Sequence, residues 1–119
     1  MQVASRLLEF GYGVFKDITG AHDVDLIAYK NGKFTRIQVK TRTSKNGAVN
    51  FPRYSGGREI KRQVQGDEFD VMAMYVRDRN LVLFMPVAEL VQKAQGVVVR
   101  VEAARNNQSG RWYESYTRM

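Results

Sequence analysis

The chain has 119 residues, which suits one domain with its own hydrophobic core, and its 44% hydrophobic content argues against disorder. It has no cysteine, so disulfides and thiolate metal sites are excluded, and no apolar run reaches the roughly 18 residues of a membrane span. The formal net charge of +7 favours a polyanionic partner, nucleic acid above all, over a membrane surface or an acidic protein, although a solvated surface can also carry such a charge. We therefore expect a cytoplasmic, nucleoid-associated protein.

The start of the chain predicts a short helix followed by a strand. Val3 and Leu7 lie on one stripe of a helix over 2–10, and Gly11 is the expected C-terminal stop. No capping residue precedes this pattern, so we expect a helix that is cut short at its N-terminus. Residues 12–15 are then expected to form the first strand.

Residues 23–41 predict a β-hairpin. Two β-rich runs flank Asn31-Gly32, the strongest two-residue hairpin signal, because both central residues of a type I′ turn need a positive φ. If these two residues are the whole loop, Lys30 pairs with Lys33. That pair then fixes the register along both strands.

The register would gather four polar side chains on one face of the hairpin. It sets Asp25 opposite Gln38 and Asp23 opposite Lys40, and side chains of a strand alternate between the two faces. Directly opposed residues have Cβ atoms about 5 Å apart. A carboxylate, an amide oxygen and an ammonium this close indicate a small metal-assisted active site. An ordinary surface Asp–Lys pair on an edge hairpin is the alternative.

The donor types fit a hard divalent cation such as Mg²⁺, which prefers oxygen ligands and keeps several waters. Asp25 would supply a charged oxygen, Gln38 a neutral amide oxygen and Val39 its backbone carbonyl. Lys40 beside the ion could orient or deprotonate an attacking water, or stabilise charge on a pentacovalent phosphorane.

The segment 42–62 is strongly basic and contains several glycines. We expect it to be a long, mobile loop, with possible helical structure from about Gly57 to Gln65. Interleaved aromatic residues suit contact with a nucleic-acid backbone and stacking on bases, although a solvated excursion would look similar. The candidate DNA-binding residues, including one arginine of the hairpin face, are Arg36, Arg42, Lys45, Arg53, Tyr54, Arg58, Lys61 and Arg62.

The second half of the chain predicts three more strands and a helix. The apolar runs 69–76, 81–85 and 97–101 are expected to be strands, and 87–95 a helix that stops at the following glycine. The last nine residues, 111–119, could be a short helix or a packing tail. The whole chain, 1–119, is thus expected to be a single α/β or α+β domain without internal repeats.

Asp25, followed on the next strand by Gln38-Val39-Lys40, resembles the Asp…(Glu/Gln)-x-Lys signature of the PD-(D/E)XK nuclease superfamily. Further segments match in order across nearly the whole chain. They are similar to the group I intron-associated homing endonucleases of this superfamily, in which Gln replaces the usual Glu. Archaeal Holliday junction resolvases are more distant relatives. The matching segments are 7–14, 24–27, 37–41, 84–87 and 106–108.

The resemblance implies an α/β, restriction-endonuclease-like mixed β-sheet flanked by helices. It also implies hydrolysis of phosphodiester bonds in duplex DNA by a homodimer or homotetramer that uses Mg²⁺, with Mn²⁺ as a possible substitute. Asp25 would be a metal ligand, Gln38 the substitute for the second acid and Lys40 the catalytic lysine. Such enzymes usually carry a first-helix glutamate, which here would precede Met1, and Asp23 is a candidate replacement. A Holliday junction resolvase and an inactive DNA-binding module on the same fold are the alternatives.

Overall fold

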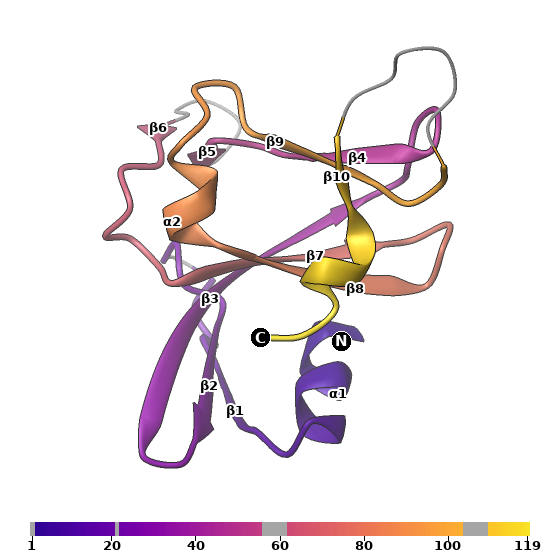
Figure 1. Ribbon diagram of the computed structural model, residues 1–119. Coiled ribbons are helices and arrows are strands. Elements are labelled where there is room, and N and C mark those ends of the chain that lie inside the picture. Colours follow the sequence, from indigo (N-terminus) through magenta and orange to yellow (C-terminus); the bar gives the residue numbers. More distant parts are fainter. Residues whose placement is uncertain (1, 21, 56–61, 104–109) are drawn as a thin grey trace.

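A computed structural model of the protein describes residues 2–20, 22–55, 62–103 and 110–119. In it, a helix and a small second sheet cover opposite faces of a central mixed sheet (Figure 1). The predicted mixed α/β sheet is therefore confirmed.

In chain order the elements are α1 (Gln2–Glu9), β1 (Gly13–Lys16), β2 (Leu26–Lys30), β3 (Lys33–Arg42), β4 (Ala48–Phe51), β5 (Tyr54–Ser55), β6 (Arg62–Gln63), β7 (Val71–Val76), β8 (Leu81–Pro86), α2 (Val87–Leu90), β9 (Val97–Arg100), β10 (Arg111–Trp112) and the 3-10 helix η1 (Tyr113–Tyr116).

The central sheet has the strand order β1-β2-β3-β7-β8. β3 and β7 run parallel, and the other neighbouring strands run antiparallel. At the hairpin turn, Asn31 and Gly32 have φ values of 54° and 78°, and Lys30 pairs with Lys33. The predicted turn and its register are confirmed, because only residues that tolerate positive φ can close a two-residue loop of this hand.

α1 packs on one face of the central sheet. Its buried residues, Val3 and Leu7, contact buried side chains of β2, β3, β7 and β8. Gly11, with a φ of 89°, ends the helix as predicted, because the left-handed conformation after a helix favours glycine. The C-terminus returns to this side, where the Arg118 guanidinium lies 5.0 Å from the centre of the Phe10 ring (Figure 1).

The second sheet, in the order β10-β9-β4, packs with α2 and η1 on the other face. Val49 and Phe51 of β4 point inward, and so do alternate valines of β9. They meet the side chains of β7 and β8 that α1 does not contact, among them Met72, Met74 and Met85. Two separate apolar layers thus enclose the central strands, and both faces of β7 and β8 are dry, which explains their continuous apolar sequence.

The segment 42–62 is not the long loop that the composition predicts. β3 continues to Arg42, and a second tight turn at Asn46-Gly47, with φ values of 52° and 76°, leads into β4. β5 and β6 then pair as a short antiparallel ribbon. Part of the possible helix over 57–65 lies outside the described residues, and its end is the strand β6 rather than a helix. Strand pairing satisfies the backbone that a loop would expose.

Two other elements differ from the predictions. The helix expected over 87–95 is only the four-residue α2, followed by turns up to Gly96. The C-terminal segment 111–119 begins with β10, which pairs with β9, before it forms η1. The short helix expected as one alternative here is thus present as η1, and β10 precedes it because Arg111 pairs with the distant Val99. Within the described residues, no helix is long and apolar enough to cross a membrane.

Candidate active site

Asp25 lies where the hairpin ladder ends. Regular pairing of β2 with β3 stops at Leu26 and Ile37, one pair before the predicted pair of Asp25 with Gln38. The Asp25 backbone N–H donates to the carbonyl of Ile37 at 2.9 Å, and its Oδ2 accepts the Val39 N–H at 2.7 Å. The predicted cross-strand opposition is therefore wrong in detail. The carboxylate takes the place of a backbone partner and lies directly against β3.

Asp23 departs further from the predicted register. It is not paired with Lys40 in any strand ladder, and its carboxylate accepts two hydrogen bonds from the Arg62 guanidinium at 3.4 Å. The chain leaves the β-ladder before Asp23 because β2 begins only at Leu26. Asp23 nevertheless remains close enough to Lys40 for its charge to raise the pKa of that amine.

Gln38 is the polar residue that stands out in this region. It is only 6% exposed, and it pairs with Met72 of β7, deep in the parallel part of the central sheet. Its Oε1 has no hydrogen-bond partner within the described part of the chain. A buried acceptor without a donor costs about 1–3 kcal/mol, which a donor or a cation bound at this oxygen would offset.

Lys40 follows Gln38 on the same face of β3, where it pairs with Met74. Burial lowers the pKa of its ammonium, and the neighbouring Arg42 lowers it further. Burial raises the pKa of the Asp25 carboxyl, while the Val39 N–H and the Lys40 charge oppose this rise. The two groups thus act on each other electrostatically, and each is half-buried. Asp25 and Lys40 therefore lie near each other, and Gln38 lies on the same face of β3 as Lys40; their grouping as a site stays a prediction.

The donor set suits a hard cation more than a soft one. It comprises the Asp25 carboxylate, the Gln38 amide oxygen and the backbone of Val39, all oxygen donors. The Val39 N–H points towards Asp25, and in a strand the N–H and C=O of one residue point to the same side, so its carbonyl also faces this carboxylate. Among the described residues, no three His, Cys, Asp or Glu side chains gather as a metal cluster.

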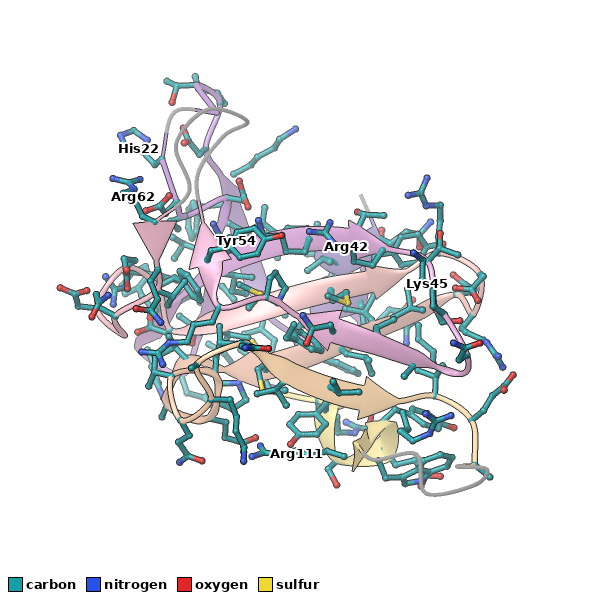
Figure 2. The ribbon with its side chains drawn as sticks, turned by 90° about the horizontal axis from the view of Figure 1, so that it is seen from above. His22, Arg42, Lys45, Tyr54, Arg62 and Arg111 are labelled. Atoms are coloured by element: carbon teal, nitrogen blue, oxygen red, sulfur yellow. The ribbon has the colours of Figure 1, made fainter. Side chains whose placement is uncertain are left out.

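The candidate DNA-binding residues separate into two groups. Figure 2 shows Arg42, Lys45 and Tyr54 along one edge of the molecule, with Arg62 and His22 towards the end of that edge. Arg42 and the phenol group of Tyr54 both act electrostatically on Lys40, so this edge adjoins the candidate site. Arg58 and Lys61 lie outside the described residues.

Arg36 and Arg53 are engaged within the protein. The Arg36 guanidinium donates to the Asp70 carboxylate at 3.1 and 3.3 Å and to the backbone carbonyl of Asp67 at 3.0 Å. Arg53 donates through Nε to the Val64 carbonyl at 3.1 Å. Arg36 thus ties β3 to the segment before β7, and Arg53, between β4 and β5, is held to the segment after β6.

Sequence reasoning missed a polar cluster beside Asp25. The carboxylate of Asp17 accepts hydrogen bonds from the backbone and hydroxyl of Thr19 and lies 3.0 Å from Nδ1 of His22. The hydrogen bonds from Thr19 and then from His22 hold the pKa of Asp17 well below its usual range. Asp17 also donates its backbone N–H to the Asp25 carbonyl, so the cluster fixes the chain that carries Asp25. The short spacing Asp-x-Thr is a turn signal that could have located it.

Comparison with known proteins decides the family. A family model described as "PD-(D/E)XK endonuclease" matches the chain over residues 1–119. The chain belongs to the PD-(D/E)XK endonuclease family. A curated relative, "Protein 5.3" of Escherichia phage T7, is 32% identical in an alignment of 88 positions that covers 71% of this chain and 71% of that protein.

A solved structure shares the fold of this PD-(D/E)XK endonuclease. It is titled "The structure of a bacterial homing endonuclease: I-Ssp6803I" and superposes with a TM-score of 0.71 at 22% identity. The match covers 97% of this chain and 80% of that chain. The likeness confirms the restriction-endonuclease-like arrangement of the mixed sheet and its flanking elements, which the resemblance predicted.

Proposed function

We propose that this PD-(D/E)XK endonuclease is a divalent-metal-dependent enzyme that hydrolyses phosphodiester bonds in duplex DNA. The observation that carries the proposal is the buried, unpartnered Oε1 of Gln38, next to the half-buried Asp25 and Lys40. A fold maintained for DNA binding alone would gain stability from an apolar residue at this core position. The unpartnered acceptor therefore favours an active site over an inactive DNA-binding module.

Asp25, Gln38 and Val39 would hold the metal through a carboxylate oxygen, the Oε1 atom and the backbone carbonyl. We propose Mg²⁺, with Mn²⁺ as a substitute, because the donors are all hard oxygens. Bound there, the ion would supply Lewis-acid stabilisation of the negative charge that develops on the phosphate. Asp25 Oδ2 already accepts the Val39 N–H at 2.7 Å, so the carboxylate is oriented in advance.

Lys40 would serve the attacking water. Because burial and Arg42 lower the pKa of Lys40, more of its amine is deprotonated near neutral pH than in an exposed lysine, and this form can accept a proton from water. The water oxygen would then bond to phosphorus to give a pentacovalent phosphorane, a P–O bond of the diester would break, and the departing oxygen would take a proton from solvent. The lysine, now protonated, stabilises the negative charge of the pentacovalent phosphorane.

The basic edge next to Lys40 would position the DNA. Arg42, Lys45 and Tyr54 lie there, and Arg62 lies near Asp23 at one end. Arginine and lysine contacts to phosphates supply sequence-independent affinity through counterion release. Arg36 and Arg53 are left out of this surface because both side chains are engaged with other segments. The DNA-binding roles of Arg58 and Lys61, which lie outside the described residues, remain predictions.

We propose that the active form is a homodimer or homotetramer associated with the nucleoid. The described part of one chain contains one candidate site. Cleavage of both DNA strands at a defined place needs a second site, which another subunit would supply. A chain of 119 residues also contacts few bases by itself, so a long target needs further subunits. The structural likeness to a homing endonuclease supports a target of this kind.

A substrate panel tests the proposal directly. The purified protein is incubated with linear duplex, four-way junction and single-stranded DNA of matched length, each with Mg²⁺, Mn²⁺, Ca²⁺ or EDTA. Endonucleolytic products from linear duplex in Mg²⁺ and Mn²⁺, and none in EDTA, are expected. Preference for the junction would instead indicate a resolvase. Steeply salt-dependent binding without any cleavage in either metal would show an inactive DNA-binding module.

A further inference from the structure

A groove of about 380 Å³ runs beside the candidate active site, between the end of β3 and the outer side of β4. Its lining residues include Arg42, Thr43, Lys45, Asn50, Tyr54 and Val98. Arg42 and Tyr54 also act electrostatically on Lys40, so the groove begins next to that amine. Its volume is within the range of about 300–1,000 Å³ typical of small-molecule pockets, which is enough for one nucleotide.

The backbone of β4 determines which of its side chains face this groove. Val49 and Phe51 are buried, with exposed fractions of 4% and 0%, so the alternation of a strand turns Asn50 to the outer face. Asn50 is exposed, and it pairs across the strands with Val98, which is 39% exposed. A short apolar floor thus lies next to an exposed amide.

The chemistry of the groove matches the parts of a nucleotide. Arg42 and Lys45 supply two positive charges, and no carboxylate is among the described residues that line the groove. Tyr54, 37% exposed, presents an aromatic ring. Asn50 presents one donor and one acceptor side by side. The two cations suit phosphates, the ring suits a base or a sugar, and the amide suits a base edge.

We propose that this groove is a nucleotide subsite flanking the scissile phosphate, and that Asn50 reads one base there, with a preference for adenine. The preference follows because an asparagine amide can pair in two places with N6 and N7 of adenine. Arg42 and Lys45 hold the neighbouring phosphates and carry no sequence information. The inference rests on the proposed function only in taking DNA as the ligand and Lys40 as the marker of the cleaved bond.

Selection from a duplex library with randomised positions tests the inference through binding, independently of cleavage. Wild-type protein, Asn50→Ala and the matched control Gln92→Ala each select in Ca²⁺, and the enriched sequences are counted. Gln92 is an exposed amide that lies outside the groove. We expect wild type and Gln92→Ala to enrich adenine at one position, and Asn50→Ala to lose this preference by roughly 5- to 150-fold. An unchanged preference in Asn50→Ala, or no base preference in wild type, would overturn the inference.

A second variant separates base readout from loss of folding. Asn50→Asp keeps the size of the side chain but offers only acceptors, so the selected base should change from adenine to cytosine, whose N4 amino group is a donor. By contrast, Arg42→Ala and Lys45→Ala should weaken binding to all sequences alike, each reducing the salt slope by about one. A change of base preference in either of these two variants would contradict the division of roles.

Failure of the inference and failure of the proposed function give different results. If adenine selection depends on Asn50 but no duplex is cleaved in Mg²⁺ or Mn²⁺, the subsite stands and the nuclease proposal fails. If duplex DNA is cleaved but the selected sequences are the same in Asn50→Ala, the nuclease proposal stands and the subsite fails.

Discussion

Replacing Gln38 with methionine should make the protein more stable and remove its response to Mg²⁺. Methionine has nearly the same shape and length as glutamine but no acceptor that needs a donor. In the protein, Gln38 is 6% exposed, pairs with Met72 on the neighbouring strand and leaves Oε1 without a hydrogen bond from the described residues. The substitution thus removes an unsatisfied polar atom from an apolar position without opening a cavity.

The size of the effect follows from the cost of that acceptor. An unsatisfied buried acceptor destabilises by about 1–3 kcal/mol, so Gln38→Met should raise the free energy of unfolding in EDTA by that amount. For a chain of this length the melting temperature should rise by about 4–12 °C. Wild type should also gain about 1.4 kcal/mol when Mg²⁺ is present at ten times its dissociation constant, and Gln38→Met should gain much less.

Thermal unfolding followed by circular dichroism, in EDTA and across a Mg²⁺ series, measures both effects. Gln38→Glu is the matched counterpart, because a carboxylate at this position is costly in EDTA but is a stronger ligand. It should melt lower than wild type in EDTA and respond more strongly to Mg²⁺. The reasoning is refuted if Gln38→Met is less stable than wild type in EDTA, or if all three proteins respond equally to Mg²⁺.

Two further predictions concern the scaffold. Gly96→Ala should lower the free energy of unfolding by about 1–3 kcal/mol or more, because φ is +96° and a Cβ would lie 2.1 Å from the Phe51 carbonyl oxygen. The urea midpoint should fall further than in Gly20→Ala, where φ is +68° but the space around the Cβ is open. Equal falls in the two variants would contradict the steric argument. Asp70→Asn should make the free energy of unfolding depend less on pH in acid. Hydrogen bonds from Arg36 lower the folded-state pKa of Asp70 below its ordinary 3.8, so the stability that Asp70 contributes is present above about pH 4 and is lost as pH falls through the folded pKa. Parallel stability curves of wild type and Asp70→Asn would refute that contribution.

The sequence predicted elements whose signals are local. Asn31-Gly32 defines the hairpin because its two residues both adopt positive φ, and Gly11 ends α1 for the same reason. The second Asn-Gly pair, Asn46-Gly47, has the same conformation, but it lies in a basic, glycine-containing segment whose composition favours a loop. The alternation of β4 was likewise hidden in a segment that composition marks as a loop. β5 and β6, two residues each, depend on pairing with each other and carry no periodic signal of their own.

The sequence predicted the face on which two of the candidate site residues lie, but not the position of Asp25. Gln38 and Lys40 share a face because strands alternate, and this needs no tertiary information. The position of Asp25 depends on where the ladder between β2 and β3 ends. Beyond that end, the Asp25 carboxylate accepts the Val39 N–H in place of a backbone carbonyl. The engagement of Arg36 could not be foreseen, because its partner Asp70 is 34 residues away in the sequence.

The most direct test of the central claim is the nicking of supercoiled plasmid by wild type and Lys40→Ala in Mg²⁺, alongside measurement of duplex binding in Ca²⁺. Lys40 is half-buried beside Asp25 and Gln38, so its removal should abolish metal-dependent cleavage. Both proteins should bind duplex DNA with similar affinity and have similar melting curves. Cleavage by Lys40→Ala at the wild-type rate would contradict the account of this site.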